Sequence, residues 1–188
     1  MKSGKLSIAP LTAERWPDLV ELFGERGACG GCWCMYWRLP KLEYGAGKGP
    51  ANREALHRIL EEGQVPGILA YAGSEVAGWC AVAPRQTYVR LQASRALRPI
   101  DDLPVWSVSC LFVRRGYRKQ GISVALLKHA ARFAKESGAQ IVEGYPVQPK
   151  TENYPEPALW TGTVGAFAAA GYQEAGRGPT GRGIWRSV

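Results

Sequence analysis

The stretch of sequence that decides the fold runs from Val105 to Ala134 and reads VWSVSCLFVRRGYRKQGISVALLKHAARFA. Its first part, residues 105–113, is rich in Val, Trp, Phe and Leu and contains no Gly or Pro, which predicts a buried strand. Beyond the turn, apolar side chains recur every three or four positions until Gly138, which predicts an amphipathic helix of about 18 residues. A strand, a short basic turn and a long helix in succession indicate a mixed α/β protein.

The turn between this strand and helix reads Arg118-Lys119-Gln120-Gly121-Ile122-Ser123. The first N–H groups of a helix have no partner within it and carry the positive end of the helix dipole, so they can converge on a phosphate. Gly121 has no Cβ to keep a ligand from the backbone, and Arg118 and Lys119 add positive charge. The turn lacks both the GxxxxGK[ST] spacing and the GxGxxG spacing. It therefore predicts a pyrophosphate site of a different kind.

The rest of the chain alternates between predicted strands and helices. Thr12 is a suitable N-cap for an amphipathic helix reaching Phe23, and a second helix is predicted from Pro50 to Gly63. Residues 24–49 between them are rich in Gly, Cys and aromatic residues and are predicted as a loop. Residues 1–188 are interpreted as one domain of the α/β (α+β) class. The remaining predicted elements are strands over 5–9, 67–72, 76–82, 140–145, 172–175 and 183–187, and helices over 85–97 and 163–170.

The turn resembles the R/Q-x-x-G-x-G/A signature of the Gcn5-related N-acetyltransferases (GNAT), with Arg118 and Gly121 matching and Ser123 standing where that family usually has Gly or Ala. The neighbouring strand, the long helix and the late segment GAFAAAGY extend the resemblance. It implies a mostly antiparallel central sheet, splayed between its fourth and fifth strands and flanked by helices, with acetyl-CoA in the opening. The resemblance further implies that the pantetheine arm lies along Leu111, Phe112 and Val113, and that the pyrophosphate is held by Arg118, Lys119, Gln120, Gly121, Ile122 and Ser123.

The residues that would move protons are less evident. Where the family often has a catalytic carboxylate this chain has Ser107, and where it often has a late Tyr this chain has Phe167. Strand alternation places Ser107 and Ser109 on one face, where either could position a water molecule. Glu143 and Tyr145 share a face of the next strand, which makes Glu143 the candidate base and Tyr145 the candidate acid or substrate contact. The alternative for Glu143 is a structural ion pair with an Arg.

The most unusual segment outside the turn is residues 28–38, ACGGCWCMYWR. Because the resemblance implies that this region and the one around residue 160 border the acceptor, we interpret them as walls of the substrate pocket. Trp33, Tyr36, Trp37 and Trp160 would give flat apolar surface, and Arg38 a contact for a carboxylate. Structural packing is the alternative. Three thiols, Cys29, Cys32 and Cys34, also suggest zinc, but no fourth ligand is visible, and no metal site is predicted.

Composition limits the partners. The net charge of +8 is spread along the chain without the interleaved aromatic residues of a nucleic-acid platform, so no nucleic-acid partner is predicted. No secretory signal or membrane-spanning segment is evident, so we expect a cytoplasmic protein without a membrane partner. Five cysteines, an odd number, argue against a disulfide framework. The sequence is also compatible with a homodimer.

These observations favour an N-acetyltransferase that moves an acetyl group from acetyl-CoA to the amine of a small molecule by direct attack in a ternary complex. Two alternatives belong to other classes. One is a non-catalytic acyl-CoA binding or sensing domain, because the usual catalytic residues are replaced at Ser107 and Phe167. The other is a basic nucleic-acid binding protein. Glu152 and Glu156, in the polar loop 146–159, could attract a cationic amine, although exposed loop carboxylates are usually only solvated.

Overall fold

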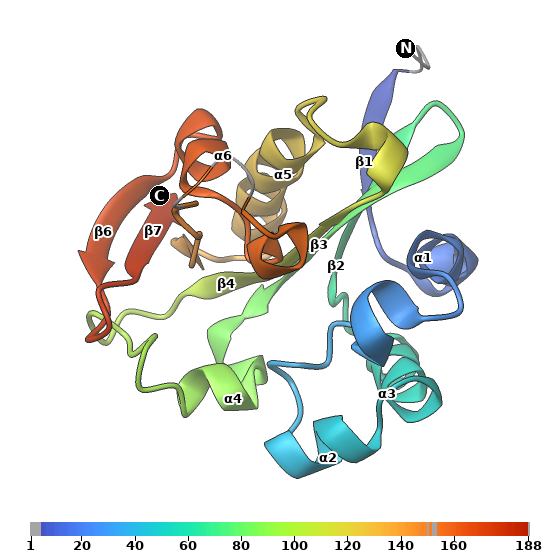
Figure 1. Cartoon of the computed structure of the whole chain (residues 1–188), viewed down its shortest axis with the longest axis horizontal. Helices are drawn as coiled ribbons and strands as arrows, with labels where there is room; N and C mark the ends of the chain where they lie inside the picture. The colour runs from blue at the N-terminus through green and yellow to red at the C-terminus, as the bar shows by residue number, and fades with distance from the viewer. Residues whose placement is uncertain (1–4, 150, 152–153, 188) are drawn as a thin grey trace.

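The protein is built around a seven-stranded sheet with the strand order β1-β2-β3-β4-β5-β7-β6 (Figure 1). The computed structural model describes residues 5–149, 151 and 154–187. Neighbouring strands are antiparallel except β4 and β5, which are parallel. The mixed, mostly antiparallel sheet that the resemblance implied is therefore confirmed. The strands are β1 (Leu6–Pro10), β2 (Gly67–Ala72), β3 (Glu75–Pro84), β4 (Trp106–Val113), β5 (Val142–Gly144), β6 (Gln173–Arg177) and β7 (Gly183–Ser187).

Helices cover both faces of the sheet, as Figure 1 shows. Alternate residues of a strand point to opposite faces. Ile68 and Ala70 of β2 accordingly join the core beneath α5 and α6, whereas Leu69 joins the core beneath α1 and α3. The helices are α1 (Trp16–Phe23), α2 (Lys41–Ala46), α3 (Pro50–Glu61), α4 (Val89–Gln92), α5 (Ile122–Glu136) and α6 (Val164–Ala169).

The sheet opens between β4 and β5. Three residue pairs join the two strands, and the last of them is Val108 with Gly144. On the other side of β4, the pairing with β3 shifts register so that Ser109 stands opposite no β3 residue, which is a β-bulge. Beyond the bulge, the N–H of Leu111 donates a hydrogen bond across the opening to the carbonyl of Trp160 (2.7 Å). The predicted splay between the fourth and fifth strands is confirmed.

Several boundaries differ from the sequence-based expectation. The predicted loop 24–49 contains α2, whose short length and internal Gly45 give little periodic signal. The basic helix predicted over 85–97 is reduced to α4 and a 3-10 turn at Arg85–Thr87, because Arg85 turns inward and is buried. β5 is shorter than predicted, since the chain leaves the sheet after Gly144. None of the described helices is both long and apolar enough to cross a lipid bilayer.

Candidate active site

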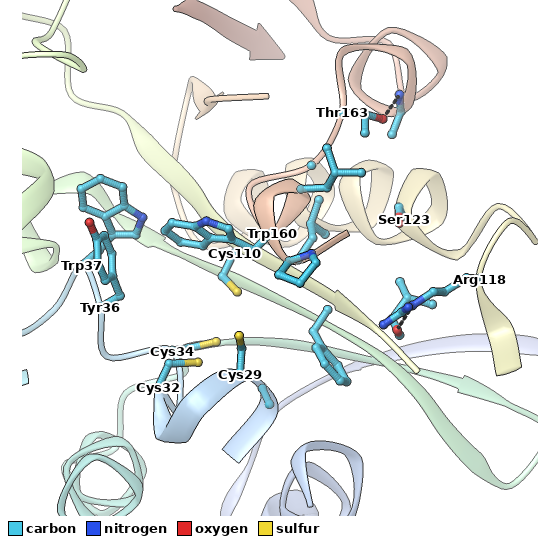
Figure 2. Close-up of a pocket in the computed structure, with 18 of the residues that line it drawn as sticks. Cys29, Cys32, Cys34, Tyr36, Trp37, Cys110, Arg118, Ser123, Trp160 and Thr163 are labelled. Atoms are coloured by element: carbon cyan, nitrogen blue, oxygen red, sulfur yellow. Dashed lines mark hydrogen bonds between the residues drawn. The ribbon is translucent and has the colours of Figure 1, made fainter. Parts of the chain in front are cut away.

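A cavity of about 570 Å³ follows the open edge of β4. Figure 2 shows Arg118 and Ser123 at one end, Tyr36 and Trp37 at the other, and cysteine side chains between them. One cavity therefore joins the basic turn to residues 28–38, which we call the aromatic loop. Its lining is Ala28, Cys29, Cys32, Cys34, Tyr36, Trp37, Tyr44, Cys110, Leu111, Phe112, Val113, Arg118, Ser123, Pro157, Leu159, Trp160, Gly162, Thr163 and Ala166.

The basic end of the cavity is built mainly from backbone. Gly121 immediately precedes α5 with φ 79°, a left-handed conformation that favours Gly, and a Cβ placed there would meet no atom within 4 Å. The open space in front of this glycine and the amides at the start of α5 suit a pyrophosphate. Arg118 Nε donates to the Val113 carbonyl (3.0 Å), which ties the turn to β4. Arg118 and Ser123 line the cavity.

The other predicted cofactor residues fall into two groups. Lys119 and Gln120 are exposed on the turn, and the side chain of Ile122 is buried in the core, so Ile122 can offer a ligand only its backbone. Leu111, Phe112 and Val113 line the cavity, as expected for residues beside a pantetheine arm. The N–H of Leu111 is already bonded to the Trp160 carbonyl, so a ligand that uses this amide must replace that bond.

Three of the four candidate catalytic residues form a buried network outside the cavity lining. Tyr145 donates to Glu143 Oε1 (2.8 Å), and its hydroxyl also lies 2.9 Å from Ser107 Oγ. Arg85 donates to the same Glu143 oxygen (3.0 Å) and to the Tyr145 hydroxyl, while Arg186 Nε donates to Glu143 Oε2 (3.0 Å). Burial, and next the charge of Glu143, raises the pKa of Tyr145 far above its usual value.

This geometry argues against the choice of Glu143 as base. The Glu143 side chain is 1% exposed, both of its oxygens accept hydrogen bonds from Arg residues, and it does not line the cavity. A base must come within hydrogen-bond reach of the proton it removes. Ser107 and Tyr145 are fully buried in the same network, and Ser109 at the bulge is buried as well. The arrangement instead matches the structural ion pair that the sequence left open.

The aromatic end contains two of the predicted loop residues and excludes two others. Tyr36 and Trp37 line the cavity with Trp160, and their contact with the acceptor stays a prediction. Trp33 does not line it, because its side chain is 2% exposed and packs edge-on against Phe23 with ring centroids 5.5 Å apart. Arg38 turns away as well: it donates to the carbonyl of Pro66 (3.5 Å) and its guanidinium lies 4.6 Å from the centroid of the Tyr88 ring.

Sequence reasoning missed two contributors to the cavity. Tyr44 belongs to α2, which had been predicted as loop, so nothing marked its side chain as part of a wall. Cys110 alternates with the candidate serines along β4 and faces the cavity on the opposite side of the strand. Strand alternation was the available signal for Cys110. Glu152, and the side chain of Glu156, lie outside the described part of the chain.

Four thiols form the middle of the cavity wall. A hydrogen bond with Cys110, followed by burial, raises the pKa of Cys34, and Trp79 Nε1 lies 3.1 Å from the Cys34 sulfur. Burial raises the pKa of Cys32, whereas Cys29 is exposed. The thiols do not make up a metal-ligand group: within the described residues, the group whose donor atoms all lie within 4.8 Å of one another is Glu54, His57 and Glu61 on α3.

The chain that forms this cavity matches a known protein family. Residues 33–152 match the acetyltransferase (GNAT) family, a range that includes residues 33–38 of the aromatic loop, β4, the basic turn and α5. The chain belongs to this family. No curated protein matches the sequence significantly.

Solved structures with the same fold include GNAT enzymes of low identity. The aminoglycoside N-acetyltransferase AAC(6')-Iy, in complex with a bisubstrate analogue of CoA, is 17% identical, with a TM-score of 0.55 over 93% of this chain and 95% of its own. The PaiA N-acetyltransferase of Thermoplasma acidophilum, in complex with coenzyme A, is 14% identical, with a TM-score of 0.53 over 97% of this chain and 98% of its own.

A third match comes from a larger protein, a GCN5-related N-acetyltransferase from Kribbella flavida. It is 13% identical, has a TM-score of 0.51, and matches over 93% of this chain but 34% of its own, so the chain spans about a third of that protein. Coenzyme A or its analogue in the other two structures agrees with acetyl-CoA as the co-substrate of this acetyltransferase family.

Proposed function

We propose that this chain transfers the acetyl group of acetyl-CoA to the amine of a small molecule by direct attack within a ternary complex. The observation that carries the proposal is the continuity of the cavity, which runs from the start of α5 to the aromatic loop. A cofactor held at the basic end and an acceptor held at the aromatic end would meet in its middle, beside Cys110. Holding both reactants in one site removes much of the entropic cost of bringing them together.

The transfer requires a deprotonated amine. The nitrogen attacks the thioester carbonyl, a C–N bond forms, the C–S bond breaks, and the amine proton is returned to the departing thiolate. Because the Glu143 network does not reach the cavity, the described groups able to pass this proton are the thiols, the phenols and the hydroxyls of Ser123 and Thr163 in the cavity wall. A phenol is protonated near neutral pH, and burial raises the pKa of Tyr44 further, so its hydroxyl can donate a hydrogen bond but is a weaker acid than an exposed phenol.

The direct test is release of free CoA from acetyl-CoA in the presence of a panel of amines. We expect release that depends on both substrates, with intersecting initial-rate patterns, because a ternary complex forms before either product leaves. Intact mass measurement of the acceptor should show one added acetyl group. Tight binding of acetyl-CoA without release for any amine would reject transfer and leave cofactor binding intact.

A non-catalytic acyl-CoA sensor is the second candidate. The observation in its favour is that Ser107 and Phe167, at positions where the family often carries catalytic groups, are both fully buried. An aminoglycoside acceptor, as the name of AAC(6')-Iy would suggest, is not favoured. Such a molecule carries several ammonium groups, and no carboxylate belongs to the described lining of this cavity.

A further inference from the structure

Four aromatic rings from three segments of the chain meet at the end of the cavity opposite the basic turn. Trp37 stacks on Trp160 with an interplanar angle of 29° and centroids 5.8 Å apart. Tyr36 meets Trp160 and Tyr44 edge-on, with centroids 5.2 and 5.4 Å away. Tyr36 and Trp37 come from the aromatic loop, Tyr44 from α2, and Trp160 from the segment before α6. We call these four rings the aromatic wall.

Arg90 holds two residues of the aromatic wall, Tyr36 and Trp37, in place from outside the cavity. Its guanidinium lies 3.9 Å from the centroid of the Tyr36 ring and donates to the Tyr36 carbonyl (3.1 Å), while its backbone N–H donates to the Trp37 carbonyl (2.9 Å). Arg90 itself is not part of the cavity lining. Aromatic side chains held in place before binding offer a large contact area at little entropic cost.

The charge of the cavity selects against cationic acceptors. Within the described lining, Arg118 at the far end is the one charged side chain, and the rest near the aromatic wall are rings, thiols and aliphatic groups. Aromatic faces can attract cations, but Arg90 already lies over Tyr36 and within 5.8 Å of the Tyr44 ring centroid. A second positive charge would be repelled by Arg90 and would lose its water without gaining a counterion.

The same environment helps the chemistry. Burial in an apolar site disfavours the charged form of an amine and so lowers its pKa. An acceptor bound here as the free base has a nucleophilic nitrogen and needs no carboxylate base from the described lining, which contains none. The sulfur atoms of Cys29, Cys32 and Cys110 beside the rings add polarizable surface that suits an aromatic ligand.

From these observations we infer the substrate class: the acceptor is an arylalkylamine, a flat aromatic ring that bears a single primary amine on a short chain, and the ring packs on the aromatic wall. The inference rests on the proposed acetyl transfer and names its acceptor. The cavity of about 570 Å³ must hold the pantetheine arm as well, which limits the acceptor to one or two rings.

The test measures kcat/KM for a set of matched amines, with acetyl-CoA as the co-substrate. Phenethylamine and tryptamine are set against butylamine, which lacks the ring, and spermidine, which carries several charges. Burying one aromatic ring should give the arylalkylamines about 10- to 100-fold higher kcat/KM than butylamine. Faster turnover of spermidine or butylamine than of both arylalkylamines would overturn the inference and leave acetyl transfer standing.

Substitutions in the aromatic wall test whether these rings cause the preference for arylalkylamines. Trp37→Ala should raise the KM for phenethylamine about 10-fold or more, with less change in kcat and none in the affinity for CoA. Trp16→Leu is the matched control, because it also removes a partly buried indole but lies outside the cavity lining. An equal loss in both variants would point to general destabilisation and contradict the assignment of Trp37.

Calorimetry separates this inference from the proposed function. Phenethylamine should bind the CoA-loaded protein, and Trp37→Ala should weaken that binding whether or not any amine is acetylated. If no amine is acetylated but this binding is found, acetyl transfer fails and the ligand class stands. If acetylation of other amines is found without phenethylamine binding, the ligand class is wrong.

Discussion

The two ends of the cavity are constructed differently. The basic end depends on backbone: the left-handed Gly121, the open space before it and the first amides of α5. The aromatic end depends on side chains brought together from the loop, α2 and the segment before α6. A backbone site is specified by a few adjacent residues and serves one constant ligand, whereas a side-chain site can change its ligand through single substitutions. The cofactor end should therefore be the less tolerant of mutation.

The largest loss of function is expected when the backbone end of the cavity is blocked. Gly121→Glu adds bulk and negative charge where we propose that the pyrophosphate binds, and we expect CoA affinity to fall about 100-fold or more. Calorimetric titration with CoA measures the change. Gly138→Glu is a matched control at the other end of α5, since this glycine also has positive φ (90°) and open space for a Cβ. Unchanged affinity in Gly121→Glu, or equal loss in both variants, would refute the pyrophosphate site.

The buried network around Glu143 lies outside both ends of the cavity and should contribute to stability rather than to turnover. Glu143→Gln removes a charge buried between Arg85 and Arg186, so the free energy of unfolding should fall by about 3 kcal/mol. Turnover per folded molecule should change little. Denaturant titration and steady-state kinetics provide the two measurements.

The control for this variant is Glu136→Gln, which breaks an exposed pair with Arg132 and should cost less than about 0.5 kcal/mol. A large drop in turnover for Glu143→Gln with unchanged stability would instead restore Glu143 as the catalytic base. That result would also indicate that acetyl transfer takes place near Glu143 and not beside the thiols.

The smallest expected effect concerns the thiols between the two ends. The thiolate is the reactive form, and burial raises the pKa of Cys32 while Cys29 is exposed. Maleimide should therefore label Cys29 several-fold faster than Cys32 at about pH 8, and the difference should narrow as the pH rises. Peptide mass mapping gives both rates.

Bound acetyl-CoA supplies the second half of this experiment. It should slow labelling at Cys29 and Cys110 about two- to fivefold if the cofactor arm reaches the middle of the cavity. Cys80 is fully buried away from the lining, so it should stay unlabelled with and without acetyl-CoA and reports that the protein remains folded. Unchanged labelling at both cavity thiols, with Cys80 still unlabelled, would place the arm elsewhere.

The difference between the two ends also explains what could be predicted from the sequence. The β4–turn–α5 unit was predictable because its strand pattern, its helix pattern and Gly121 lie within some thirty consecutive residues. Tyr44 could not be placed, since its position depends on how α2 folds against the loop. Trp33 and Tyr36 look alike in the sequence, but positive φ at Trp33 and Cys34 turns the chain so that Trp33 points into the core.

The role of Glu143 could not be predicted from the sequence either. Its position on β5, next to the splay, was predictable, but the arginines that occupy it come from residues 85 and 186. Neither is near Glu143 in sequence, and nothing local distinguishes a carboxylate that faces a cavity from one enclosed by cations. Long-range partners decide the role of such a residue.

The hydrogen bond from the Leu111 amide to the Trp160 carbonyl joins the two ends of the cavity. If the cofactor arm takes over this amide, the segment that carries one ring of the aromatic wall is released to move. Binding of the two substrates should then be coupled in free energy, and such coupling is reciprocal. The factor by which CoA changes the affinity for the acceptor must equal the factor by which the acceptor changes the affinity for CoA, so either titration reports on the bond between Leu111 and Trp160.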